Sequence, residues 1–167
     1  MVVLQFDVND EALRRAFFDH LLLDAAAGLG VDDSPRWGAM NAQHMLEHLQ
    51  WAFACSTGSV DVACTTPQHL LERAKRFLRD NRHTPHEFRN PLLGETPLPF
   101  RCADLDGARG ALQKEVATFV RHFLDEPDSL HVHPLFGPLG AEEWQRAHFK
   151  HGFHHMLQFG LVGEPAP

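Results

Sequence analysis

Two histidine pairs with helical spacing are the residues of this chain best suited to chemistry. His151 and His155 are four positions apart, and so are His44 and His48. Side chains at positions i and i+4 of an α-helix are neighbours, with Cβ atoms roughly 5–6 Å apart. Two imidazoles at this spacing can bind one metal ion, as in other helical H-x-x-x-H sites. The spacing predicts a metal site but leaves the reaction open.

The helical face on which each ring lies separates the candidate ligands. In a helix over residues 141–161, the two imidazoles share one face with apolar and amide side chains. This face consists of Trp144, His151, His155, Gln158 and Val162. In the helix expected after Asn41, His48 borders the core face, whereas His44 lies nearer the edge. Three imidazoles from two helices would leave coordination positions open to water or substrate, which is the catalytic rather than the closed structural pattern. We therefore interpret His48, His151 and His155 as metal ligands and His44 as a rim residue.

Other side chains have weaker claims. Gln158 could form a hydrogen bond with a ligand imidazole on the side of the ring that faces away from the metal. Cys55 lies about 10 Å along its helix from His48 by helical rise, so it is expected to be a core residue and not a ligand. Glu115 and His122 are expected at a solvated edge, and His20 in the core or at its rim. Because the chain has 13 histidines, an empty cluster of exposed or hydrogen-bonded rings is the alternative to a metal site.

The elements that must position these residues are mostly helical. Apolar periodicity and capping residues predict helices over 10–27, 41–55, 66–80, 104–125 and 141–161. Asn41 can cap the second helix, and Thr66-Pro67 is a favourable start for the third. The predicted fold class is all-α, a four-helix bundle with a long crossover that carries an extra short helix. We expect a single domain over residues 1–167.

One segment has no predicted regular element. Residues 81–102 contain four prolines, at positions 85, 91, 97 and 99. A structureless loop of this length is uncommon in a compact domain. The segment is interpreted either as a cover over the site or as an element that the pattern fails to indicate.

Composition narrows the classes of partner. The 167 residues carry a net charge of −7, which argues against nucleic-acid binding. No apolar run approaches the roughly 20 residues that span a bilayer, and the first residues lack a signal-peptide pattern, so no membrane association is expected. The three cysteines form no closely spaced pair, which favours a reducing, cytoplasmic location.

Two stretches of the chain resemble the DinB/YfiT-like superfamily. Residues 37–49, WGAMNAQHMLEHL, resemble the second-helix motif of a branch whose members carry WGxMxxQxMxxHL. Residues 133–139, HPLFGPL, followed by Glu143-Trp144 and by KHGFHHMLQFG at 150–160, resemble the C-terminal motif of that branch. The two motifs cover about a third of the chain, and the expected helix layout extends the resemblance over most of it.

The resemblance implies a DinB-like four-helix bundle whose divalent metal, zinc or nickel, is bound by one histidine of the second helix and two of the last. These positions are His48, His151 and His155 here, whereas many relatives carry Gln where this chain has His44. The superfamily includes metal-dependent thiol transferases and a thiol-dependent isomerase. It therefore implies a metal-dependent transferase or hydrolase that acts on a small-molecule substrate, with a low-molecular-weight thiol as a further cofactor. A non-catalytic metal or small-molecule binding protein is the alternative, a homodimer is left open, and no catalytic base is assigned.

Overall fold

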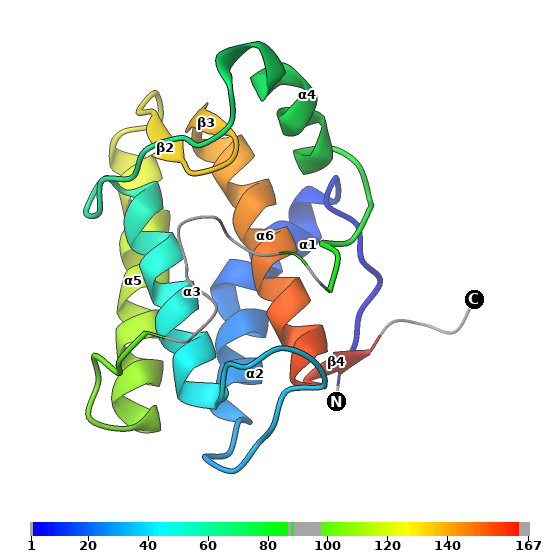
Figure 1. Ribbon diagram of the computed structural model, residues 1–167, viewed down its shortest axis with the longest axis vertical. Helices are drawn as coiled ribbons and strands as arrows, with labels where there is room; N and C mark the ends of the chain where they lie inside the picture. Colours follow the sequence, from blue (N-terminus) through cyan, green and yellow to red (C-terminus); the bar gives the residue numbers. More distant parts are fainter. Residues whose placement is uncertain (1, 87, 89–97, 164–167) are drawn as a thin grey trace.

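The computed structural model describes residues 2–86, 88 and 98–163 of the chain. Its helices are α1 (Glu11–Ala16), the π-helical turn η1 (Phe17–Leu21), α2 (Leu22–Ala27), α3 (Ala42–Ser56), α4 (Leu71–Lys75), α5 (Leu105–Asp125) and α6 (Ala141–Gln158). Figure 1 shows α3 between α5 and α6, which run alongside it. The N-terminal helical segment contacts both α5 and α6 through α2. The mostly helical fold that the sequence predicts is confirmed.

Side-chain caps fix where three of the helices begin. Asp10, Asn41 and Asp104 each accept a hydrogen bond from the backbone N–H three residues ahead, at 3.0, 2.9 and 2.8 Å. Such caps satisfy backbone donors that the first helical turn leaves without a partner. The predicted starts of these helices are therefore confirmed. The start predicted at Thr66 is wrong in detail, since Pro67 occupies the capping position and makes no side-chain cap.

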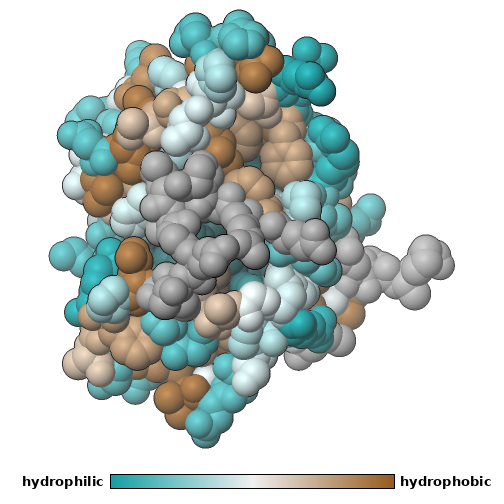
Figure 2. Space-filling view, viewed as in Figure 1, coloured by the Kyte–Doolittle hydropathy of each residue, from teal (hydrophilic) through white to brown (hydrophobic). Residues whose placement is uncertain are grey.

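The connection from α3 to α5 carries the short helix that the sequence predicts. α4 is flanked by the 3-10 turns η2 (Gln68–Leu70) and η3 (Arg76–Leu78), and it forms one end of the molecule (Figure 1). Hydrophilic side chains gather over this end (Figure 2). The described part of the segment 81–102 contains no helix or strand. Residues 87 and 89–97 lie outside the described residues, so the predicted cover over the site stays a prediction.

Two small sheets correct the expectation of an all-α fold. β1 (Val2–Val3) pairs in parallel with β4 (Val162–Gly163), and β2 (His131–His133) pairs antiparallel with β3 (Gly137–Leu139). Strands of two or three residues are too short for the apolar alternation that identifies a strand in a sequence. The last helix was expected to reach residue 161 but ends at Gln158, because Gly160 takes a left-handed conformation (φ 68°) and turns the chain out of the helix.

The core is built from aromatic and aliphatic side chains of every long helix. The apolar stripe predicted on α5 is buried throughout, at Leu105, Ala108, Leu112, Val116, Phe119 and Phe123. α6 is covered on both sides, because Phe149 and Phe153 are buried opposite its histidine face. Gly152 allows η1 to approach α6 closely, since a Cβ there would lie 2.5 Å from Cζ of Phe17. Among the described residues, no helix is long and apolar enough to cross a membrane.

Candidate metal centre

The three predicted ligands converge between α3 and α6. His48 extends from α3, whereas His151 and His155 extend from successive turns of α6. The Nε2 atom of His151 lies 2.7 Å from Nε2 of His48 and 3.1 Å from Nε2 of His155. These ring nitrogens all lie within 4.8 Å of one another, and no other group of three or more His, Cys, Asp or Glu side chains in the described part of the chain meets this criterion. We call these three residues the triad.

A hydrogen-bond chain behind the triad fixes the tautomer of His155. The side-chain amide of Gln158 donates to the backbone carbonyl of Trp37 at 2.7 Å, so its oxygen must face the other way. That oxygen lies 2.7 Å from Nδ1 of His155 and can only accept, which places the ring proton on Nδ1. A neutral His155 therefore presents a lone pair at Nε2, toward the other two rings. Gly38 leaves room for this chain, because a Cβ there would lie 2.8 Å from Nε2 of Gln158.

Burial keeps the triad neutral. Removal from water, with smaller effects from the positive charges that His154 and Arg101 can carry, lowers the pKa of His48 to about 4. Burial is also the largest cause that lowers the pKa values of His151 and His155 well below their usual range. A positive charge on His48 would lower the pKa of each of these two rings further. Neutral imidazole is the form that binds metal, so the site is set for a cation at physiological pH.

A divalent metal ion fits this set of donors. At 2.0–2.1 Å from a tetrahedral zinc ion, ligand nitrogens stand roughly 3.3 Å apart, so the 3.1 Å contact nearly matches and the 2.7 Å contact would have to lengthen. Without a cation, the lone pair of His155 needs a proton from His151, which is also the nearest partner of His48. His155 is buried, whereas His48 and His151 are only half-buried. A ligand would therefore approach from the side of His48 and His151.

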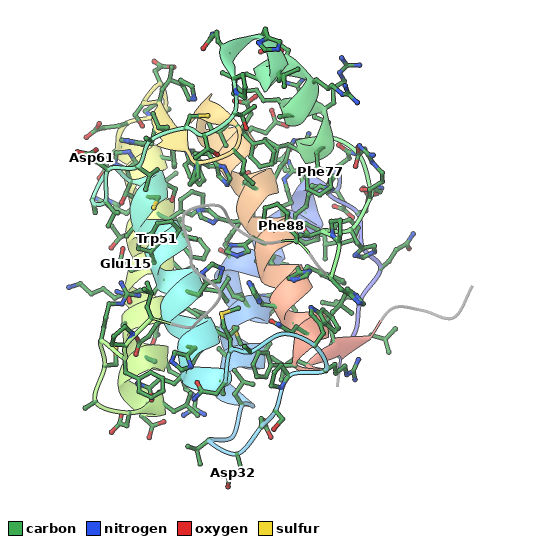
Figure 3. All side chains as sticks on the ribbon, in the orientation of Figure 1. Asp32, Trp51, Asp61, Phe77, Phe88 and Glu115 are labelled. Carbon is green, nitrogen blue, oxygen red and sulfur yellow. The ribbon has the colours of Figure 1, made fainter. Side chains whose placement is uncertain are left out.

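Aromatic side chains flank the region between α3 and α6. The Trp51 ring lies nearly parallel to the His48 ring, with 6.5 Å between their centroids. Figure 3 shows Trp51 beside α3 and Phe88 across from it, over α6. Phe88 is 47% exposed. A small molecule that reaches the triad on the His48 side would meet the apolar surface of Trp51.

His44 and His154 are not part of the triad, as the sequence predicts. The His44 ring stacks on Phe100 with 4.2 Å between centroids, and its buried Nδ1 has no hydrogen-bond partner among the described residues. The Nδ1 atom of His154 instead lies 3.3 Å from the backbone oxygen of Thr84. A closed four-histidine site that includes His44 is therefore not formed.

Glu47 is a buried carboxylate beside the triad that sequence reasoning missed. It is 5% exposed and accepts hydrogen bonds from the backbone N–H groups of Arg101 and Cys102, at 2.8 and 3.0 Å. The Gln43 amide donates to it at 3.0 Å, and the Arg101 guanidinium donates to its backbone oxygen. Burial alone would raise the pKa of Glu47, but these hydrogen bonds together hold it below its usual range. Glu47 thus fixes residues 101–102 against α3 next to His48. No sequence signal singled it out, because it occupies an unspecified position of the WGxMxxQxMxxHL pattern.

The remaining sequence candidates lie away from the triad. Cys55 is buried, which raises the pKa of its thiol to about 11, so its predicted role as a core residue is confirmed. His20 is exposed, and its predicted core or rim position is wrong because the π-helical turn η1 rotates it off the apolar face. Glu115 lies along α5, on the other side of α3 from α6 (Figure 3). His122 also lies on α5, where it contacts His131.

Comparisons of the chain with known proteins give no relative from which a function could be transferred. No family model matches it, and no curated protein and no solved structure matches it either. Three nearby histidines, His48, His151 and His155, could hold a metal ion.

Proposed function

We propose that this chain is a DinB-like four-helix-bundle metalloenzyme. His48, His151 and His155 would bind a divalent ion, zinc or nickel, and the reaction would be a thiol-dependent transfer or a hydrolysis. The convergence of the three Nε2 atoms, with the tautomer of His155 fixed by Gln158, is the observation that carries the proposal. The four helices would be the segment α1–η1–α2 together with α3, α5 and α6. The contacts of α3 and of α2 with both α5 and α6 support this arrangement.

The composition of the triad favours activation chemistry over a purely structural role. An ion bound by three neutral imidazoles keeps its full charge, and it would lower the pKa of a thiol or water that approaches it. The chain itself offers no activated thiol at Cys55 or Cys102, because burial raises the pKa of both. A low-molecular-weight thiol is therefore the better nucleophile. The three free cysteines agree with a proposed cytoplasmic location.

The alternative is a protein that binds a metal or small molecule without catalysis. A deep cleft over the triad would favour the enzyme. Two surface pockets in the described part of the chain, one lined by α5 and the other by α5 with η1 and α2, include no residue of the triad. The position of His44 favours the enzyme, since a fourth histidine ligand would have closed the site. Aromatic rings near the triad, including Trp51, agree with a small-molecule ligand in either case.

Metal analysis of protein made without a histidine tag tests the proposal. We expect about one equivalent of zinc or nickel that is lost in His151→Ala and kept in the control His44→Gln. Turnover should then be sought with a panel of thiols and activated acceptors. Turnover that survives His151→Ala or chelation would overturn the metal mechanism. A fully loaded triad with no turnover over the panel would favour the binding protein.

A further inference from the structure

A second histidine cluster lies where α5 ends and the β2–β3 hairpin begins. The Nε2 atoms of His122, on α5, and His131, on β2, are 2.8 Å apart, and the Ser129 hydroxyl oxygen lies 3.0 Å from Nε2 of His122. The ring centroids are 4.8 Å apart with 52° between the planes. The spacing of the two nitrogens is close to the 2.7 Å found within the triad. We call His122 and His131 the hairpin pair.

The hairpin pair is short of protons. Ser129 has one hydroxyl hydrogen, and it donates this hydrogen to the backbone oxygen of Glu126 at 2.9 Å. The Ser129 oxygen can therefore only accept from His122. If His122 donates its Nε2 proton, that single proton must serve both the Ser129 oxygen and Nε2 of His131. Three electron-rich atoms thus face one another with one proton between them, whereas a cation could be bound by all three.

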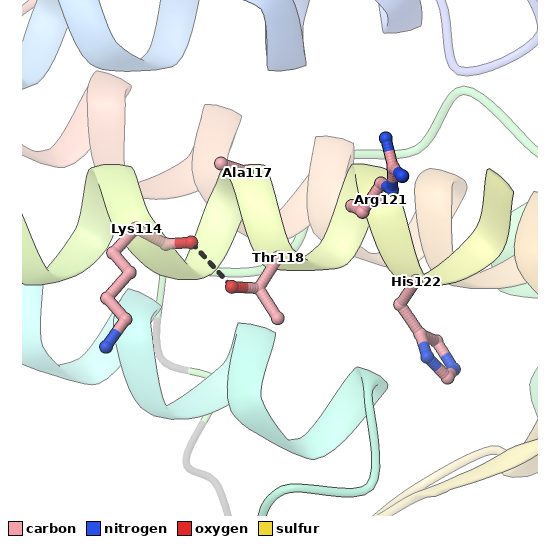
Figure 4. Close-up of a pocket in the computed structure, with 5 residues that line it drawn as sticks. All are labelled: Lys114, Ala117, Thr118, Arg121 and His122. Carbon is pink, nitrogen blue, oxygen red and sulfur yellow. Dashed lines mark hydrogen bonds between the residues drawn. The ribbon is translucent and has the colours of Figure 1, made fainter. Parts of the chain in front are cut away.

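Packing holds His131 in place while His122 stays reachable. A Cβ on Gly58, in the turn after α3, would lie 2.8 Å from Nδ1 of His131, so this ring packs tightly against that turn. The Trp144 indole donates to the backbone oxygen of His131 at 3.2 Å. His122 lines an open surface pocket of about 480 Å³, and Figure 4 shows its ring leaving α5 on the side opposite Arg121. A metal ion could therefore enter from solution.

We propose that the hairpin pair, with the Ser129 oxygen, is a second binding site for a divalent transition metal. Two imidazoles and an oxygen suit zinc, nickel or copper(II), with water completing the coordination. Burial and the neighbouring His122 lower the pKa of His131, and the Glu126 carboxylate opposes this effect. The same carboxylate would add a favourable negative field for a cation. A metal bound here cross-links the C-terminal end of α5 to β2. The site is independent of the triad and of the function proposed for it.

Zinc titration of the full chain, purified without a tag and stripped of metal, tests this proposal. A chromogenic chelator that competes for zinc reports both the number of sites and their order of affinity. We expect two equivalents in the wild type, the second bound at least about tenfold more weakly, because it has one nitrogen fewer. His122→Gln should lose the weaker equivalent and His151→Ala the tighter one. The double variant should bind none.

A second readout guards against a variant that simply misfolds. In His151→Ala, which keeps only the hairpin pair, zinc should slow the hydrogen exchange of backbone amides in residues 131–133. Ser129→Ala, a smaller change, should weaken this zinc binding without changing the fold. A zinc stoichiometry that His122→Gln leaves unchanged would overturn the proposal and leave the pair as an imidazole–imidazole hydrogen bond. A single wild-type equivalent that His122→Gln removes would instead leave the hairpin site standing and the triad empty.

Discussion

The triad and the hairpin pair present almost the same nitrogen-to-nitrogen distance in different surroundings. His48 and His151 approach to 2.7 Å between two long helices, and His122 and His131 approach to 2.8 Å between a helix and a short strand. The triad adds a third ring, whose tautomer Gln158 fixes, whereas the pair adds only a hydroxyl. A short distance alone therefore does not define a strong site. The number of lone pairs, and how firmly their direction is fixed, should decide the order of affinity.

Removal of the central ring of the triad should have the largest effect. The Nε2 atom of His151 contacts both other triad nitrogens, so His151→Ala leaves only His48 and His155, which belong to different helices. We expect loss of the tight zinc equivalent and of any metal-dependent turnover, while the hairpin pair still binds. Zinc competition with a chelator measures the first effect. Tight binding that persists in His151→Ala would show that the triad is not the primary site.

Loss of the support behind His155 should have a smaller effect. In Gln158→Ala, Nδ1 of His155 loses its acceptor at 2.7 Å, so neither the tautomer nor the ring orientation is fixed. Such outer partners typically contribute a factor of about 10–100 in metal affinity. We expect the triad to weaken by that factor and the hairpin pair to be unchanged. His154→Ala, on the same helix but outside the triad, is the control, and an equal loss there would deny Gln158 a specific role.

A methyl group between the two α6 ligands should affect stability. A Cβ on Gly152 would lie 2.5 Å from Phe17, so Gly152→Ala must push α6 and η1 apart, at a cost of about 1–3 kcal/mol in the free energy of unfolding. Gly110→Ala is a matched control, because a Cβ at Gly110 meets no atom within 4 Å in the middle of α5. It should stabilise by about 0.5–1 kcal/mol through helix propensity. Denaturant unfolding compares the two, and opposite signs are expected.

Acid should have the smallest effect on the triad near neutral pH. The pKa of His48 is lowered to about 4, so its folded-state ring takes up a proton only as pH falls toward 4. Three unperturbed imidazoles would lose roughly thirtyfold in metal affinity between pH 7 and 6, because their pKa values lie near 6.5. In His122→Gln, which isolates the triad, we expect a change below about twofold over this range. A thirtyfold loss in the chelator assay would mean that the rings are not neutralised by burial.

The same lowered pKa values predict acid sensitivity of the metal-free protein. The unfolded chain binds protons on histidine below about pH 6.5, whereas folded His48 and His133 do so only near 4 and 3. The contribution of these neutral histidines to the free energy of unfolding is therefore fully present above pH 6.5 and decreases as the pH falls below this value. The midpoint of urea unfolding should be lower at pH 5 than at pH 7. Zinc should raise the midpoint at both values by binding only the folded state.

The sequence by itself determined the local structure and the identity of the triad. Capping by Asp10, Asn41 and Asp104 is a short-range hydrogen bond, so these helix starts follow from a few neighbouring residues. Helical periodicity likewise placed His151 and His155 on one face, because that geometry is the same in every α-helix. The choice of His48 over His44 came from the apolar pattern around each, and the structure brings His48, not His44, to the other two rings.

Only the tertiary structure decided how these parts meet. The strands β1 to β4 are two or three residues long and form through partners distant in sequence, as Val2 does with Val162. The hydrogen bonds between Glu47 and the backbone of residues 101–102 likewise join different parts of the chain, as does the contact between His122 and His131. The lowered pKa of His48 arises from burial, which no local pattern specifies. Such features depend on how helices pack in three dimensions, whereas a sequence pattern indicates only which face of each helix is apolar.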